Sequence, residues 1–253
     1  MFTMAELYYF SPTGGTRKVG LNVCEEIAAS VKEINLGQKD RAIEQPSHDI
    51  TVVAAPVFGG RIPAVMADKL RNLDGNGKKA VSLVVYGNRA YEDALLELNH
   101  VLTKCGFQIA ASGAFIAQHS IVPEVGQGRP DEQDIAEIRG FAKKVLNKLS
   151  DNVDSTITVP GNFPYKDGMK SPATPFSLPT CTLCGACAEV CPTEAIFIEN
   201  GTVATKTDHC ILCMACIAAC PQKARILPPP LQEKMGQMLG ALKSVRRENE
   251  YFL

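Results

Sequence analysis

Residues 181–192 read CTLCGACAEVCP, and residues 210–221 repeat the same pattern as CILCMACIAACP. Each copy has three cysteines at a spacing of three, then a fourth cysteine that is followed by proline, and the copies lie 29 residues apart. The repeat extends past the prolines, where residues 193–196 align with residues 222–225. Such internal repetition indicates a small module built from two related halves.

The cysteine spacing is typical of ligands to iron–sulfur cubanes. A [4Fe–4S] cubane needs four soft thiolates, of which three come from one tight loop and the fourth from elsewhere. In the two-cluster arrangement, the fourth cysteine of each run ligates the other cluster. We therefore expect two clusters, the first held by Cys181, Cys184, Cys187 and Cys220, and the second by Cys210, Cys213, Cys216 and Cys191.

Zinc and disulfides are the alternatives for these cysteines. Structural zinc sites usually consist of two separated Cys-x2-Cys pairs rather than three evenly spaced cysteines followed by Cys-Pro. Disulfide scaffolds are usually short secreted chains with cysteines throughout, whereas eight of the ten cysteines here lie between Cys181 and Cys220. The pattern therefore favours iron–sulfur clusters.

Residues 178–228 resemble the two-cluster ferredoxins of bacteria. The resemblance implies low-potential, one-electron transfer and a pseudo-twofold βαβ fold around both clusters. Free ferredoxins of this type are strongly acidic, which steers them to partners, but residues 178–228 hold four acidic and three basic side chains. A near-neutral module favours a fixed partner within the chain.

Residues 1–150 alternate short apolar runs with segments of helical periodicity. The runs are Glu6–Phe10, Val31–Leu36, Ile50–Ala55, Ala80–Tyr86 and Phe107–Ala117. Most are apolar on both faces, as in strands of a parallel sheet that is covered on both sides. The expected fold class is α/β, a doubly wound five-stranded parallel sheet, with a small α+β two-cluster module after it.

A loop of hydroxyls and glycines follows the first of these strands and precedes the first helix. Its candidate ligand-binding residues are Ser11, Thr13, Gly14, Gly15 and Thr16. Backbone N–H groups converge at a helix N-terminus, and glycine allows a phosphate to approach them closely. The loop lacks the Gly-Lys-Ser/Thr ending of a nucleotide triphosphatase and the Gly-x-Gly-x-x-Gly spacing of a dinucleotide site. A plain turn with a helix N-cap is the alternative.

Two further loops follow the third and fourth strands and meet the first loop at the switch point of such a sheet. Their candidate residues are Pro56, Val57, Phe58, Gly59, Gly60 and Arg61 in one loop, and Gly87, Asn88, Arg89 and Tyr91 in the other. The order of the three loops resembles the flavodoxin family across residues 1–150. The resemblance implies FMN, with its phosphate held by residues 11–16 without a lysine.

In flavodoxins the second and third loops sandwich the isoalloxazine ring. The resemblance makes Phe58 and Tyr91 the candidates for stacking, with a core aromatic and a helix-cap contact as the respective alternatives. A peptide at Gly59 or Gly60 would approach flavin N5. Arg61 and Arg89 depart from the acidic surroundings usual in flavodoxins, and are either cations near flavin N1 or solvated surface residues.

The sequence divides into a flavodoxin-like domain (residues 1–150), a proline-rich connector (151–179), a two-cluster module (180–228) and a C-terminal docking helix (229–253). This order resembles the flavodoxin–ferredoxin fusion proteins of anaerobic bacteria and archaea. The expected function is electron transfer between FMN and two [4Fe–4S] clusters, interconverting one- and two-electron steps. The alternatives are a flavin-dependent reductase of a quinone, pterin or nicotinamide, and a redox-sensing protein that recruits a partner. No catalytic side chain is expected.

Composition excludes several other classes of function. The chain has 253 residues and a net charge of −1, so no strong field indicates nucleic acid or anionic lipid as a partner. No apolar stretch reaches the ~18–20 residues of a membrane helix, and Met1–Phe10 lacks the features of a signal peptide. We expect a cytoplasmic protein with redox partner proteins, and a homodimer through the C-terminal helix is a possible arrangement.

Overall fold

The computed structural model describes residues 1–253 except for 40–41, 152–155 and 170–172. The main sheet has six strands in the order β10-β5-β4-β3-β1-β2. They are β1 (Phe2–Tyr9), β2 (Ala28–Asn35), β3 (Ile50–Pro56), β4 (Lys79–Tyr86), β5 (Gln108–Ile116) and β10 (Glu250–Phe252). The first five are parallel in the order 2-1-3-4-5, which is the flavodoxin-like doubly wound order. This confirms the predicted five-stranded parallel sheet.

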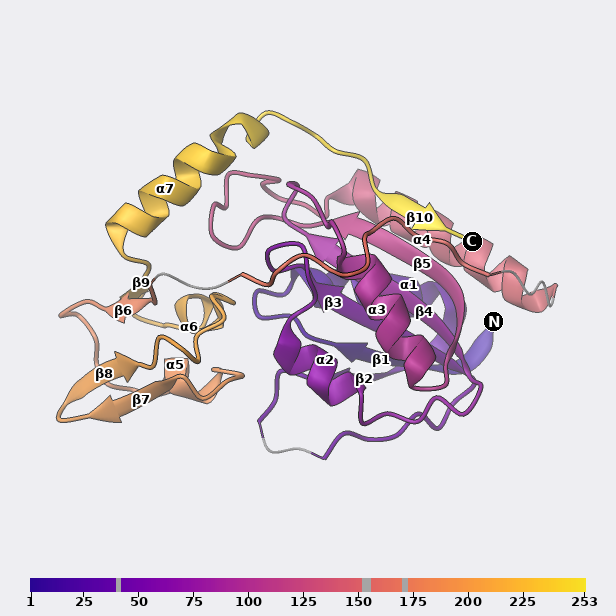
Figure 1. Ribbon diagram of the computed structural model, residues 1–253, viewed down its shortest axis with the longest axis horizontal. Helices are drawn as coiled ribbons and strands as arrows, with labels where there is room; N and C mark the ends of the chain where they lie inside the picture. Colours follow the sequence, from indigo (N-terminus) through magenta and orange to yellow (C-terminus); the bar gives the residue numbers. More distant parts are fainter. Residues whose placement is uncertain (40–41, 152–155, 170–172) are drawn as a thin grey trace.

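Helices cover both faces of this sheet (Figure 1). One face packs against α1 (Gly15–Ile27) and α4 (Glu132–Ser150), and the other against α2 (Ala64–Leu70) and α3 (Ala94–Lys104). Successive side chains of a strand point to opposite faces, so each buried strand contributes to both cores. No helix in the described parts of the chain has the length and apolar character needed to cross a bilayer.

The cysteine-rich module is a separate small unit at one end of the molecule (Figure 1). Its strands are β6 (Phe176–Ser177), β7 (Ile196–Glu199), β8 (Thr202–Thr205) and β9 (Arg225–Ile226), and its short helices are α5 (Ala186–Glu189) and α6 (Ala215–Ala218). β6 pairs with β9, and β7 pairs with β8, both antiparallel. Each short helix begins within one cysteine loop, as the sequence repeat requires.

The chain after the module returns to the main sheet. Helix α7 (Pro229–Leu239) is followed by a 3-10 turn (Gly240–Leu242) and then by β10, which pairs antiparallel with β5. The docking helix was predicted over residues 229–253, whereas the observed helix ends at Leu239. The remaining residues are held by the sheet instead, where Asn249 Oδ1 accepts the N–H of Ile116 at 3.0 Å.

The described part of the connector lies along α3 (Figure 1). Asp93, at the start of α3, accepts the backbone N–H groups of Asn162 and Lys166, both at 2.8 Å. Val159 is buried in the core that also contains α3. The connector is therefore attached to the N-terminal domain before the chain enters the module.

Candidate functional site

The structure brings the eight repeat cysteines together around two small cavities. The empty space, part of it open to solvent, is about 310 Å³ in the outer cavity and about 330 Å³ in the inner cavity. The outer cavity is lined by Cys181, Cys184, Cys187 and Cys220, and the inner cavity by Cys191, Cys210, Cys213 and Cys216. Each cavity thus combines three cysteines of one loop with the fourth cysteine of the other repeat.

The side chains that the two cavities share as candidate ligands are thiols. Among the residues that the structure describes, no group of three or more His, Cys, Asp or Glu side chains surrounds a single ion position. A cubane separates its thiolates more widely than one ion does, because irons and sulfides lie between them. The soft thiolate donor set matches iron–sulfur chemistry.

Backbone amides donate to the sulfurs of Cys191 and Cys220, the fourth cysteines of the two repeats. The N–H of Ala195 points at Cys191 Sγ at 3.3 Å, and the N–H of Ala224 points at Cys220 Sγ at 3.2 Å. Burial raises the pKa of Cys213 to about 12. Burial also acts to raise the pKa of Cys220, but its backbone N–H donors outweigh burial and hold that pKa below its ordinary value.

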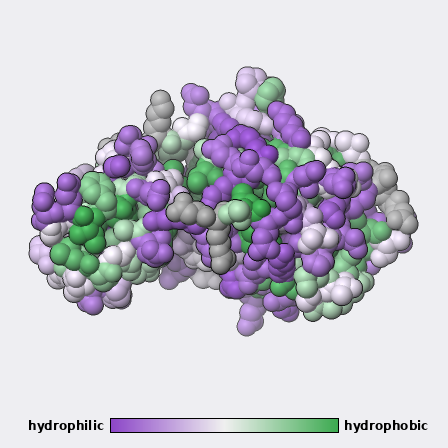
Figure 2. Space-filling model, turned by 90° about the horizontal axis from the view of Figure 1, so that it is seen from below, coloured by the Kyte–Doolittle hydropathy of each residue, from purple (hydrophilic) through white to green (hydrophobic). Residues whose placement is uncertain are grey.

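The two cysteine loops differ in what covers them. In the outer loop (residues 181–187), Cys184 is exposed and Leu183 is 40% exposed, whereas the aligned Leu212 of the inner loop (residues 210–216) is 5% exposed. Leu212 and Met214 pack in a cluster with Ile121, Val122, Val125 and Leu239. The inner loop therefore lies against the main domain and α7, and apolar side chains gather at the module end of the molecule (Figure 2).

The predicted phosphate loop opens α1 as expected. Gly14 has φ of 89°, and a Cβ placed there would meet no atom within 4 Å, so the space above the loop is open. Ser11 Oγ accepts the N–H of Arg17 at 3.0 Å. Thr13 is exposed and Thr16 is buried. Amide donors at the start of a 13-residue helix, next to open space, fit a phosphate group.

The loop after β3 is a tight turn that is already occupied by internal contacts. Phe58 and Arg61 bridge each other across Gly59 and Gly60, which have φ of 61° and 87°. The Arg61 guanidinium pairs with both carboxylate oxygens of Glu97 at 2.7 Å. Arg61 is therefore held in a half-buried ion pair and is not a freely solvated surface residue. Its predicted position near flavin N1 stays a prediction. Phe58 packs against Phe10 with ring centroids 6.2 Å apart.

The loop after β4 is covered by the C-terminal segment, which differs from the predicted flavin contact. Asn88 is fully buried, and its amide donates to the carbonyls of Leu242 and Val245 at 3.3 and 2.7 Å. Tyr91 is 8% exposed, its ring packs beside Tyr86 with centroids 5.4 Å apart, and its hydroxyl donates to Glu250 at 2.7 Å. Arg89 pairs with Glu92. The contacts of Asn88 and Tyr91 were not predictable from the sequence, because their partners lie about 150 residues away.

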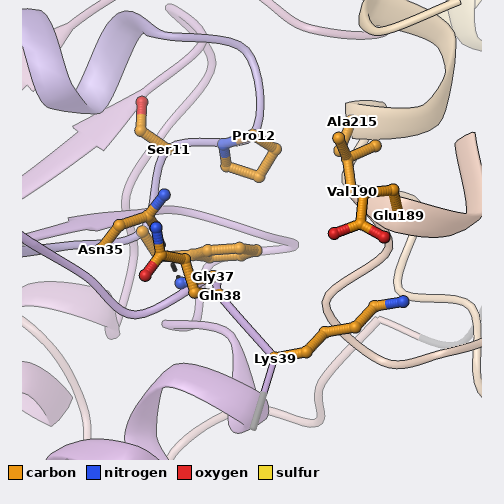
Figure 3. A pocket seen from close by; sticks show the side chains of 10 residues that line it. Ser11, Pro12, Asn35, Gly37, Gln38, Lys39, Glu189, Val190 and Ala215 are labelled. Carbon is orange, nitrogen blue, oxygen red and sulfur yellow. Dashed lines mark hydrogen bonds between the residues drawn. The ribbon is translucent and has the colours of Figure 1, made fainter. Parts of the chain in front are cut away.

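A larger cavity joins the phosphate loop to the cysteine module (Figure 3). Its volume is about 500 Å³, which is within the range of small-molecule and cofactor sites. Phe10, Ser11 and Pro12 line it from the main domain, together with Asn35, Gly37, Gln38 and Lys39, and Glu189, Val190 and Ala215 line it from the module. Of the three predicted flavin loops, this shared cavity contacts the first.

Comparisons with known proteins agree with the division of the chain. Residues 176–221 match the model of the 4Fe-4S dicluster domain, which includes all eight repeat cysteines. The search of curated proteins gave no match. Among solved structures, a flavodoxin from Streptococcus pneumonia TIGR4 is similar at 19% identity and a TM-score of 0.44, over 58% of this chain and 99% of that one.

Two other solved structures are similar over the same region. A short-chain flavodoxin associated with a non-canonical PDU bacterial microcompartment has 21% identity and a TM-score of 0.44, over 59% of this chain and 99% of that one. The rubredoxin oxygen:oxidoreductase of Desulfovibrio gigas has 16% identity and a TM-score of 0.43, over 58% of this chain and 36% of that one. Because these scores lie below 0.5, the fold assignment of the N-terminal domain follows from its strand order. The chain combines a flavodoxin-like α/β domain with a ferredoxin-like 4Fe–4S module, in the order of a flavodoxin–ferredoxin fusion.

Proposed function

We propose that this protein transfers electrons between FMN, bound by the main domain, and two [4Fe–4S] clusters in the module. The observation that carries the proposal is the shared cavity of about 500 Å³. One of its walls is the phosphate loop, at Ser11 and Pro12, and the opposite wall is the module, at Val190 and Ala215. A flavin held there would lie next to a cluster-binding loop.

Residues 11–16 would hold the FMN phosphate through backbone amides at the start of α1 and through the Thr13 hydroxyl. The isoalloxazine ring would lie in the shared cavity instead of between the loops after β3 and β4. When bound, FMN exchanges one or two electrons, and each cluster exchanges one. Ala215 lies between Cys213 and Cys216 in the chain, so a group at this wall is separated from a cluster ligand by one residue.

The ligand sets proposed for the clusters are those that line the two cavities. The outer cluster would be bound by Cys181, Cys184, Cys187 and Cys220, and the inner cluster by Cys210, Cys213, Cys216 and Cys191. The inner loop packs on the main domain, and the outer loop carries an exposed cysteine. This gives a path from an external redox protein through the outer and inner clusters to FMN.

The cofactor content of the protein tests the proposal first. Anaerobically reconstituted protein is expected to contain close to eight irons, eight acid-labile sulfides and one FMN per chain. Stoichiometric zinc, or FAD in place of FMN, would contradict it. Stopped-flow reduction of the clusters by a one-electron donor should then be followed by flavin bleaching at a rate independent of protein concentration.

A matched pair of variants tests the position of the flavin. Val190 lines the shared cavity and is 39% exposed, whereas Ile198, in the same module, is 44% exposed and does not line it. Val190→Trp is expected to weaken FMN binding at least tenfold by filling the cavity, and Ile198→Trp should leave it unchanged. Equal FMN affinity in both variants would place the flavin elsewhere.

A further inference from the structure

A buried arginine stands between the two cysteine cavities. Arg225 is 1% exposed and lines both the outer and the inner cavity. It occupies the position in the second repeat that Ile196 occupies in the first. The two halves of the module therefore differ at this position, where the apolar Ile196 corresponds to the positively charged Arg225.

The hydrogen bonds of Arg225 position the charge without neutralising it. Its terminal nitrogens donate to Ser177 Oγ at 3.1 Å, to the carbonyl of Pro175 at 2.8 Å and to Thr205 Oγ1 at 2.8 Å. All three acceptors are uncharged. Within the described residues, no carboxylate pairs with Arg225, and its buried Nε has no hydrogen-bond partner.

A buried charge that lacks a counter-charge is strongly destabilising. The clusters that the two cavities would hold can supply this counter-charge. Four thiolates outweigh the positive charge of a cubane core, so a ligated cluster is anionic, and reduction adds one further negative charge. Charges in a protein interior interact much more strongly than in water, and salt screens them less. Net charge and hydrogen bonding near a cluster set its reduction potential.

We propose that Arg225 is a fixed counter-charge shared by both clusters, which raises the reduction potential of each. The inference rests on the proposed function, because it requires clusters in both cavities. An electron taken from an external one-electron donor, such as a reduced viologen, oxidises that donor and adds negative charge beside the guanidinium. Arg225 favours this reduced state and so makes both clusters easier to reduce than a module with an apolar residue at this position.

The test compares Arg225→Gln with Arg225→Lys in the full-length, anaerobically reconstituted protein. Both clusters are titrated against viologen mediators and followed by electron paramagnetic resonance. Arg225→Gln removes the charge, and the ratio of reduced to oxidised cluster at a fixed viologen poise is expected to fall at least tenfold, which is about 59 mV for a one-electron couple. Arg225→Lys keeps the charge and should retain most of the wild-type ratio. The difference should persist at high salt.

A second pair of variants leaves Arg225 in place, in case its replacement prevents cluster assembly. Ser177→Asp would put a carboxylate next to the guanidinium, and Ser177→Asn is its uncharged control. Ser177→Asp is expected to lower the reduced fraction of both clusters relative to Ser177→Asn. Equal potentials in this pair, or equal potentials in Arg225→Gln and wild type at full iron content, would overturn the proposal. A wild-type protein without close to eight irons would instead refute the proposed function.

Discussion

The outer and inner cysteine loops share one ligand pattern but have opposite surroundings. Leu183 of the outer loop is 40% exposed, and its counterpart Leu212 is 5% exposed. Gly185 and Met214 also correspond, and both have a positive φ, at 79° and 65°. The two loops therefore differ in burial although their cysteine spacing is the same, because the inner loop packs on the main domain and α7.

Within the proposed function, this difference gives the two halves of the repeat different roles. The buried Met214 has a positive φ, which glycine adopts more easily. Its side chain packs beside Leu212 against residues of the main domain and α7. The outer loop keeps the glycine and an exposed cysteine, Cys184. One half is specialised for internal contact, and the other remains accessible to another protein.

Replacing Cys220 or Cys191, the fourth cysteine of a repeat, should give the largest difference between the two clusters. Cys220→Ala removes one of the cysteines that line the outer cavity although it follows the inner loop in sequence. We expect the outer cluster to be lost or to retain three irons, with the inner cluster intact. Iron analysis and electron paramagnetic resonance measure this outcome, and Cys191→Ala is the reciprocal control. Damage confined to the inner cluster in Cys220→Ala would refute the crossed ligand sets.

The contrast between the two leucines predicts a large difference in local stability. Leu212→Ala leaves a cavity in a packed cluster, so the free energy of local opening at α6 should fall by about 2–5 kcal/mol. Leu183→Ala removes an exposed side chain and should change the opening of α5 by no more than about 0.5 kcal/mol. Native-state hydrogen exchange of amides in the two short helices measures both values. Similar effects in the two variants would show that the loops are equally free.

The C-terminal segment (residues 240–253) should stabilise α7, which packs beside the inner loop. Asn88→Ala removes the donor to the Leu242 and Val245 carbonyls and the acceptor of the Arg247 N–H. Loss of these buried hydrogen bonds should lower the opening free energy of α7 and β10 by about 1–3 kcal/mol. Asn22→Ala, at a half-buried position on α1 whose side chain bonds Lys18 and Arg139 and not the C-terminal segment, is the control. Unchanged hydrogen exchange in α7 would mean that the segment does not hold the helix.

Low pH should destabilise residues 119–125, against which the inner loop packs. His119 Nδ1 accepts the N–H groups of Ile121 and Val122, at 3.2 and 3.1 Å, and burial lowers the pKa of His119 to about 4. The unfolded chain binds a proton near pH 6.5, so this contribution is complete above that pH and is lost as the pH falls towards 4. The loss is at most about 1.4 kcal/mol per pH unit.

Unfolding followed between pH 7 and 4 measures this dependence. His119→Gln should flatten the slope in this window, and His209→Gln, at an exposed position of the module, should leave it unchanged. An unaltered slope in His119→Gln would assign the acid sensitivity to other groups.

Features with a local cause were predictable from the sequence. The five parallel strands follow from short apolar runs, and the repeat predicted that the fourth cysteine of each copy would lie with the three cysteines of the other copy. The surroundings of Tyr91 and Asn88 were not predictable, because they depend on a segment about 150 residues further along the chain. Strand β10 has three residues, which is too short for a periodic signal, and its pairing with β5 is decided by tertiary contacts.

The difference between the leucines of the two loops was also hidden in the sequence. Leu183 and Leu212 have the same local context, Cys-x-Leu-Cys, and their burial differs because one repeat happens to face residues 121–125. Arg225 was visible as a charged residue, but its burial between two cavities required the fold of both repeats.

In topological terms, the pairing of β10 with β5 makes the iron–sulfur module an insertion into the main domain, with one end held at α3 and the other at the sheet. A module on a single tether could swing away, whereas a two-ended attachment keeps its local concentration high even if one end is cut. Cleavage at an engineered protease site at the exposed Asp167–Gly168 pair is therefore expected to leave the fragments associated on gel filtration. Deletion of residues 248–253 before the same cleavage should weaken this association, and would also leave the edge of β5 open to pairing with other chains.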